Sequence, residues 1–233
     1  MEPKKCSFRL ALGLVLMAVA MGSGAFGTPS TQIWNPSTDI QARGTMHLGI
    51  DNYFTIEGPA AGGYAFPTDL GLTYGLLPGL EIGVDAFLPQ TSPLVFNAKY
   101  AIAESDNLPA VALGGFGFGT QKDITDQNVF YGVIAKTFPM IGRLSAGYFS
   151  GNEKLLVDPS GNKDNAGMML TWDKMITDKL WACVDYAGTK SVLGSTFYGF
   201  SWAFASNTSV LFGYGTYNNG AKPTLTSQMD INI

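Results

Sequence analysis

The chain is 233 residues long, and its 14 basic and 18 acidic residues give a net charge of −4. Proteins that bind nucleic acid usually carry a basic patch, so this balance argues against a nucleic-acid partner. Charged residues make up 14% of the chain, whereas the surface of a soluble domain is usually about 25 to 35% charged. The composition therefore indicates that something other than water covers much of the surface.

The first 27 residues have the pattern of a secretory signal peptide. Lys4, Lys5 and Arg9 precede an apolar run over 10–21, and small residues follow it. The run is short of the roughly 20 residues that a membrane-spanning helix needs, so we expect residues 1–27 to be removed. Cys6 would leave with them. Cys183 would then be the only thiol, which excludes an internal disulfide.

Most of the remaining chain alternates aromatic and branched residues with polar residues or glycine, which is the two-residue period of β-strands. Each predicted strand is about ten residues long, the length that a tilted strand needs to cross a bilayer. Short turns such as 77–79 alternate with longer polar loops such as 151–164, as in outer-membrane barrels with their turns facing the periplasm. The predicted strands cover 44–56, 64–76, 79–88, 93–103, 109–119, 128–138, 142–150, 165–174, 179–187, 196–205, 208–217 and 225–233.

The composition of the two strand faces predicts which face points outward. One face is apolar in its middle and aromatic near its ends, for example Leu80, Ile82 and Val84. The other face carries charged residues and many glycines, which weaken an exposed strand but relieve crowding inside a barrel. We therefore expect the polar face inside. The alternative is a periplasmic β-sandwich that buries its apolar face. Over 110–118 and 129–135 the alternation is too irregular to predict the facing.

The last predicted strand, 225–233, alternates Met229, Ile231 and Ile233 with polar residues. It resembles the C-terminal strand that the outer-membrane assembly machinery recognises, although Ile233 stands where an aromatic residue is usual. With the strand layout, it makes the chain resemble the small porin-like β-barrels of Gram-negative outer membranes, and no motif narrows the family further.

This resemblance implies an all-β fold: a transmembrane, antiparallel, up-and-down barrel of about twelve strands. The barrel would cover 44–233. Residues 28–43 would form a periplasmic N-terminal segment, or a plug that folds into the lumen. The expected location is the outer membrane, reached through the signal peptide. The expected partners are outer-membrane lipid, the assembly machinery, and small solutes or ions.

The residues that could carry chemistry are few. His47 is the only histidine, and no general acid–base partner for it can be named, so we expect it to pack in the lumen. One histidine and one thiol are too few for a zinc or haem site. The oxygen side chains over 158–164 are weakly similar to a calcium loop, but the glycine is misplaced and no closing glutamate follows. We therefore expect no catalytic residue, metal or cofactor.

Ten charged residues are predicted to line the lumen, seven of them acids and three of them bases. Because bases cannot pair with all of the acids, water, a cation or a cationic solute must balance the excess. Three of the acids, Asp51, Asp69 and Asp85, are expected near mid-height on neighbouring strands. The predicted pore-lining residues are Asp51, Asp69, Glu81, Asp85, Lys99, Lys136, Arg143, Asp173, Asp185 and Asp230.

A twelve-stranded barrel lies between the filled interior of eight strands and the aqueous channel of sixteen or more. The predicted function is a porin-like channel for passive diffusion of small polar solutes or cations. The alternative is a structural or interaction barrel with a sealed lumen, whose outer loops bind a partner; a plug over 28–43 would favour it. An outer-membrane enzyme is the third possibility, but we expect the protein to have no enzymatic activity.

Overall fold

A computed structural model describes residues 29–233, so the predicted signal peptide lies outside the described residues. The described chain consists of twelve β-strands and one short 3₁₀ helix, η1 (Pro59–Ala61). Across residues 29–233, no helix combines the length and the hydropathy needed to span a membrane. The strands are β1 (Met46–Phe54), β2 (Thr68–Leu77), β3 (Leu80–Leu88), β4 (Leu94–Ile102), β5 (Ala110–Gly119), β6 (Val129–Phe138), β7 (Gly142–Ser150), β8 (Ala166–Thr177), β9 (Leu180–Gly188), β10 (Ser195–Ala203), β11 (Thr208–Tyr217) and β12 (Thr224–Asn232).

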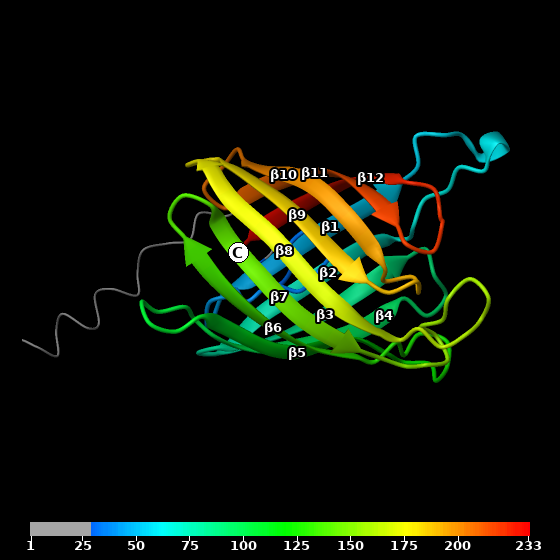
Figure 1. Ribbon diagram of the computed structural model, residues 1–233, viewed down its shortest axis with the longest axis horizontal. Helices are drawn as coiled ribbons and strands as arrows, with labels where there is room; N and C mark the ends of the chain where they lie inside the picture. Colours follow the sequence, from blue (N-terminus) through cyan, green and yellow to red (C-terminus); the bar gives the residue numbers. More distant parts are fainter. Residues whose placement is uncertain (1–28) are drawn as a thin grey trace, which may run out of the picture.

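The strands form one closed antiparallel barrel in which each strand pairs with its neighbours in sequence. β1 closes the barrel against β12, with Leu48 opposite Ile231. Figure 1 shows tight turns at one end of the barrel and longer loops at the other. The predicted fold class, an up-and-down barrel of about twelve strands, is confirmed.

A bulge in β5 explains why the alternation in its sequence is irregular. Gly117 has a φ of +68°, which residues with a side chain rarely adopt, and the register between β4 and β5 shifts next to it. Before the bulge, Phe116 packs on Tyr131 inside the barrel. After it, Phe118 packs on the exposed Phe130. The two phenylalanines, two residues apart, therefore lie on opposite faces.

Burial shows which face of the barrel meets lipid. Phe200, on the apolar face of β10, is 48% exposed, whereas Asp185, on the polar face of β9, is 0% exposed. A soluble sandwich would bury the apolar face and expose the polar one. The arrangement is that of a transmembrane barrel, with apolar side chains outward and polar side chains in the lumen.

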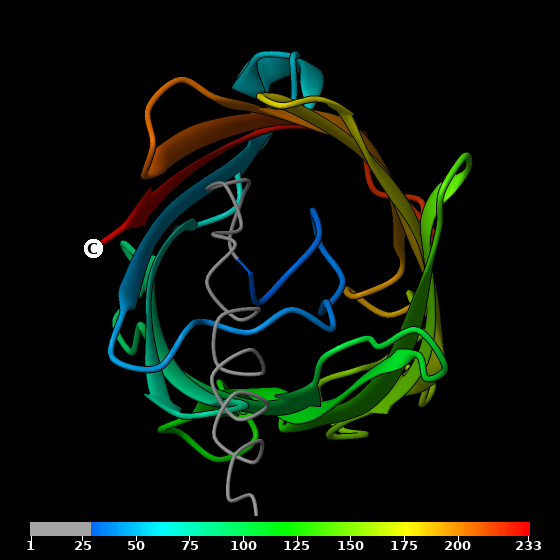
Figure 2. The same cartoon turned by 90° about the vertical axis from the view of Figure 1, so that its left-hand side faces the viewer.

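The lumen is less polar than the sequence predicts. Val133, Phe149 and Met169 point inward from β6, β7 and β8 and form an apolar cluster. Leu156, from the long loop between β7 and β8, folds into the same cluster and is fully buried. In addition, the chain before β1 runs inside the barrel, as Figure 2 shows. We call residues 29–45 the inner segment.

Candidate functional site: the barrel lumen

Nine of the ten predicted pore-lining residues point inward, and Lys136 does not. Lys136 pairs with the outward-facing Leu144 and shares a strand face with Ile134, which is 52% exposed. At the short-turn end its Nζ forms an ion pair with Glu104, 2.9 Å away. The hydrogen bond from Lys136 holds the pKa of Glu104 at about 2, well below its usual range. The prediction for Lys136 is wrong because the inward face of β6 is itself apolar, so the two faces of this strand do not differ in polarity.

Near the short-turn end, Glu81 of β3 and Lys99 of β4 form a buried ion pair. They lie opposite each other across the two strands, and Lys99 Nζ is 3.2 Å from Glu81 Oε1. The inner segment adds two donors to the same carboxylate, because Ser30 Oγ and the amide of Gln41 each lie 2.6 Å from it. The carboxylate of Glu81 is therefore paired with a base and hydrogen-bonded within the protein.

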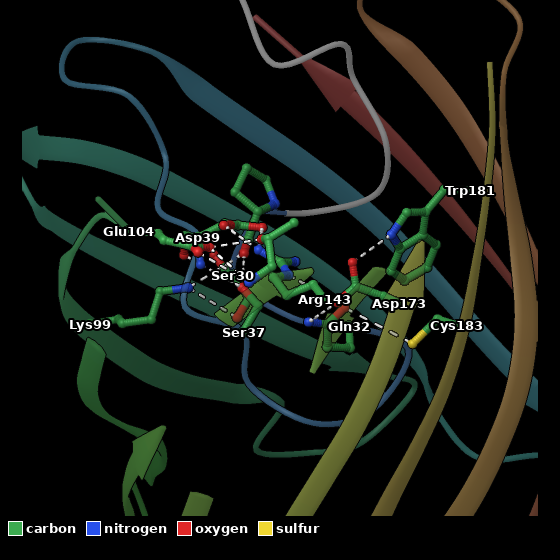
Figure 3. A network of polar contacts seen from close by, with 12 residues as sticks. Ser30, Gln32, Ser37, Asp39, Lys99, Glu104, Arg143, Asp173, Trp181 and Cys183 are labelled. Atoms are coloured by element: carbon green, nitrogen blue, oxygen red, sulfur yellow. Dashed lines mark hydrogen bonds and ion pairs between the residues drawn. The ribbon is translucent and has the colours of Figure 1, made fainter. Parts of the chain in front are cut away.

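Arg143 of β7 joins two carboxylates, one from the wall and one from the inner segment. Its Nε lies 2.9 Å from Asp173 of β8, and its Nη1 lies 2.6 Å from Asp39. Asp173 also accepts hydrogen bonds from Trp181 Nε1 and Gln32 Nε2. Figure 3 shows this group, with Arg143, Gln32 and Trp181 around Asp173.

Asp185 and Asp230 also have partners within the protein, although the second oxygen of Asp185 accepts no hydrogen bond from the described residues. The Asp185 carboxylate accepts hydrogen bonds from three successive backbone amides of the inner segment, at 3.1, 2.8 and 3.1 Å. These are the amides of Ile33, Trp34 and Asn35. Asp230 lies 3.2 Å from His47 Nε2, across the seam between β1 and β12. His47 is thus a packed lumen residue, as expected, with a partner that the sequence analysis did not find.

Among the described residues, three inward acids have neither a base nor a backbone amide as a partner. Asp51 on β1 lies directly opposite Asp69 on β2. Asp85 on β3 lies opposite Gly71, which follows Asp69 by two residues on β2. Asp85 accepts a hydrogen bond from Asn97 Nδ2 at 2.8 Å, and one buried oxygen of Asp69 has no hydrogen-bond partner. No basic side chain within residues 29–233 forms an ion pair with any of the three.

These three acids line a cavity of about 450 Å³ inside the barrel. Part of the opposite wall is apolar and includes Phe116, Phe149 and Met169. Within residues 29–233, no three His, Cys, Asp or Glu side chains are placed to hold a metal ion together. The lumen therefore offers three carboxyl groups beside an apolar wall, and the described residues form no metal site.

The sequence analysis considered that residues 28–43 could plug the lumen, but it did not find the contacts of this segment with charged residues of the wall. Asp39 and the amides around Trp34 carry no sequence pattern that marks them as partners of wall charges. Asn97 could have been found, because it lies two residues before Lys99 on the same face of β4. The pore-lining role of the nine inward residues stays a prediction, although their positions agree with it.

Comparisons with known proteins identify the fold but no family. No family model and no curated protein matches the chain. The solved structure of the KdgM porin has a TM-score of 0.54 and 9% sequence identity, and the match covers 80% of this chain and 97% of that one. A KdgM porin in complex with disordered oligogalacturonate has a TM-score of 0.51 at 9% identity, covering 81% and 97%. The NanC porin has a TM-score of 0.48 at 11% identity, covering 79% and 98%. The chain therefore has the barrel fold of a small porin.

Proposed function

We propose that the protein is a porin-like channel of the Gram-negative outer membrane, through which small polar solutes or cations diffuse passively. The main support is a set of three inward carboxylates, Asp51, Asp69 and Asp85, which face a cavity and have no basic partner among the described residues. The other inward acids are held by bases or amides, so these three supply the net charge that a solute would meet. Nothing in this arrangement is a catalytic constellation, so the proposal is a channel and not an enzyme.

The charge of these acids predicts which solutes pass. Carboxylates along a confined passage make a negative potential that concentrates cations and repels anions. Salt screens this potential only in part, because the Debye length is about 8 Å at physiological ionic strength. The KdgM structure was solved with oligogalacturonate, which is a polyanion. For the present chain we propose the opposite charge preference, so that cations and neutral polar solutes would pass instead.

The proposed route to the membrane follows the same logic. Export would use the signal peptide over 1–27, and the assembly machinery would recognise the last strand, β12. The outward apolar face, including Phe200 and Ile134, would then contact outer-membrane lipid.

The test is the reversal potential of the refolded protein in a planar bilayer under a potassium chloride gradient. We expect the parent to prefer potassium over chloride. A triple variant that changes Asp51, Asp69 and Asp85 to Asn keeps the side-chain volumes nearly constant, so we expect it to lose most of this preference. A matched variant, Glu57→Gln, changes an acid in the η1 loop outside the barrel wall and should behave like the parent. An anion-selective parent, or an unchanged triple variant, would contradict the proposal.

The inner segment specifically favours a second candidate, a structural or interaction barrel whose lumen is sealed. Its contacts reach β3, β7 and β9, so it crosses the interior. The same bilayer experiment separates the two candidates. A folded parent without conductance would support the sealed barrel.

A further inference from the structure

The inner segment makes a tight hairpin inside the lumen. Thr31 and Pro36 pair as an antiparallel bridge, and the amide of Gln32 donates to the carbonyl of Asn35 at 2.7 Å. We call residues 31–36 the lumen hairpin. Its only described covalent connection to the barrel wall is the chain that leads into β1, where Gly44 and Thr45 hydrogen-bond to Gly75 of β2.

Hydrogen bonds hold the tip of the lumen hairpin at one side of the barrel. The amides of Ile33, Trp34 and Asn35 share the Asp185 carboxylate on β9. The carbonyl of Ile33 accepts a hydrogen bond from Gln228 Nε2 of β12 at 2.9 Å. Three consecutive amides and one carbonyl of the tip therefore form hydrogen bonds with side chains of β9 and β12. These bonds fix the position of the hairpin.

Aromatic packing fixes the same tip. Trp34 is stacked on Phe197 of β10 with 5.2 Å between ring centroids, and it makes edge contacts with Tyr53 and Tyr217. Its Nε1 donates to the carbonyl of Leu193 in the loop between β9 and β10. Trp34 is thus enclosed by side chains of β1, β10 and β11.

The wall under the hairpin is shaped to receive it. A Cβ atom at Gly199 of β10 would lie 2.8 Å from Ile33 Cδ1, so a larger residue there would push the tip away. Cys183 of β9 also lies beneath the hairpin, with its Sγ 4.0 Å from Gln32 Oε1, and is 2% exposed. On the other side of the lumen, Asn97 of β4 lines the cavity.

We propose that the lumen hairpin is the element that sets the size and the route of passing solutes. It fills the side of the lumen along β9 to β12 and forms one wall of the cavity, since Ile33, Trp34 and Asn35 line it. Solutes are thereby confined to the remaining space, where they meet the three unpaired acids on β1, β2 and β3. This inference rests on the proposed channel function and assigns the size limit to Trp34 and its neighbours.

Two single-cysteine proteins test whether the hairpin covers the wall along β9 to β12 and leaves the opposite side of the lumen open. The parent reports on the hairpin side through Cys183. The Asn97→Cys variant in a Cys183→Ser background reports on the cavity side, and Cys183→Ser alone gives the background. The probe is methyl methanethiosulfonate, which is small and uncharged, so the acids do not bias its access. We expect the thiol at position 97 to react at least about tenfold faster than Cys183, because the hairpin covers Cys183.

Two variants then displace the tip by different means. Trp34→Ala removes the aromatic stack, and Gly199→Val fills the space that Ile33 uses. Loss of an aromatic contact corresponds to about a tenfold change in population, so labelling of Cys183 should rise about tenfold. Single-channel conductance should rise in the same variants. A heat-dependent shift on a detergent gel confirms that each labelled protein is a folded barrel.

The outcomes separate this inference from the proposed function. Equal labelling of the two positions in the parent would show that the hairpin does not cover its wall and would overturn the inference. If the parent conducts, variants in which Cys183 becomes reactive without any rise in conductance would overturn it too. If Cys183 becomes reactive and no variant conducts, the hairpin is a displaceable cover but the channel function is wrong.

Discussion

At the scale of single residues, inward charges differ in whether the protein itself satisfies them. Asp185 accepts three backbone amides and is fully buried. Asp51 accepts no hydrogen bond within residues 29–233, and the carboxylates of Asp230, Asp69 and Asp85 repel its charge. The first arrangement stabilises a fold, and the second costs stability. Evolution retains a cost of this kind most readily where the charge serves binding or transport.

We therefore predict opposite effects on stability for two similar substitutions. Asp185→Ala leaves three amides without an acceptor and should lower the free energy of unfolding by about 1–3 kcal/mol or more. Asp51→Ala removes a repelled charge and should leave stability unchanged or raise it. Urea unfolding in lipid vesicles, followed by tryptophan fluorescence, measures both. Equal destabilisation by the two variants would show that Asp51 has a stabilising partner.

At the scale of a strand, the two faces of β1 differ in the solvent they meet. Leu48 points outward at the middle of β1, opposite Leu72 and Ile231 on its two neighbours. Leu48→Arg should cost about 2–4 kcal/mol if this position lies near the bilayer midplane.

The matched control lies in the loop that follows the same strand. Ile56 is 80% exposed and lies beyond the end of β1, so Ile56→Arg should change the free energy of unfolding by less than about 0.5 kcal/mol. Both values come from urea titration in vesicles. If Leu48→Arg unfolds at the same urea concentration as the parent, the outward face is not in contact with lipid.

The sequence allowed the strands to be predicted because a two-residue period is local information. Each of the twelve strands was expected within a few residues of its observed bounds. The start of β2 differs most, since residues 64–67 belong to a loop in which Ala65 forms a single bridge to Phe54. The facing of β5 and β6 could not be predicted, because the bulge at Gly117 and the inward Val133 remove the contrast on which facing depends.

The candidate site was predictable only where it follows from alternation. Asp51, Asp69 and Asp85 were placed on neighbouring strands by strand order and register alone. The contacts of the inner segment were not predictable, since Trp34 and Phe197 are far apart in sequence and no period relates them. For the same reason, the amide partners of Asp185 were not foreseen, because they lie in an irregular segment.

At the scale of the whole molecule, closure of the barrel satisfies the backbone while an apolar surface remains outside. Every strand has two hydrogen-bonded neighbours, so no edge is left. A bilayer interior offers no water to unpaired amides, and a closed barrel is one of the few folds that meets this requirement. Water, by contrast, would have to cover exposed residues such as Phe130 and Tyr198 over the whole circumference.

This combination predicts both the location of the protein and its resistance to detergent. In a Gram-negative host, the protein should fractionate with outer membranes and begin near residue 28, which mass spectrometry of the purified protein would show. Unboiled samples should migrate differently from boiled ones on a detergent gel. The seam between β1 and β12 joins the two ends of the sheet, so the barrel cannot unfold by peeling from an edge and stays compact until heated. Recovery of the protein from the soluble periplasmic fraction, with the same mobility before and after boiling, would contradict the membrane assignment.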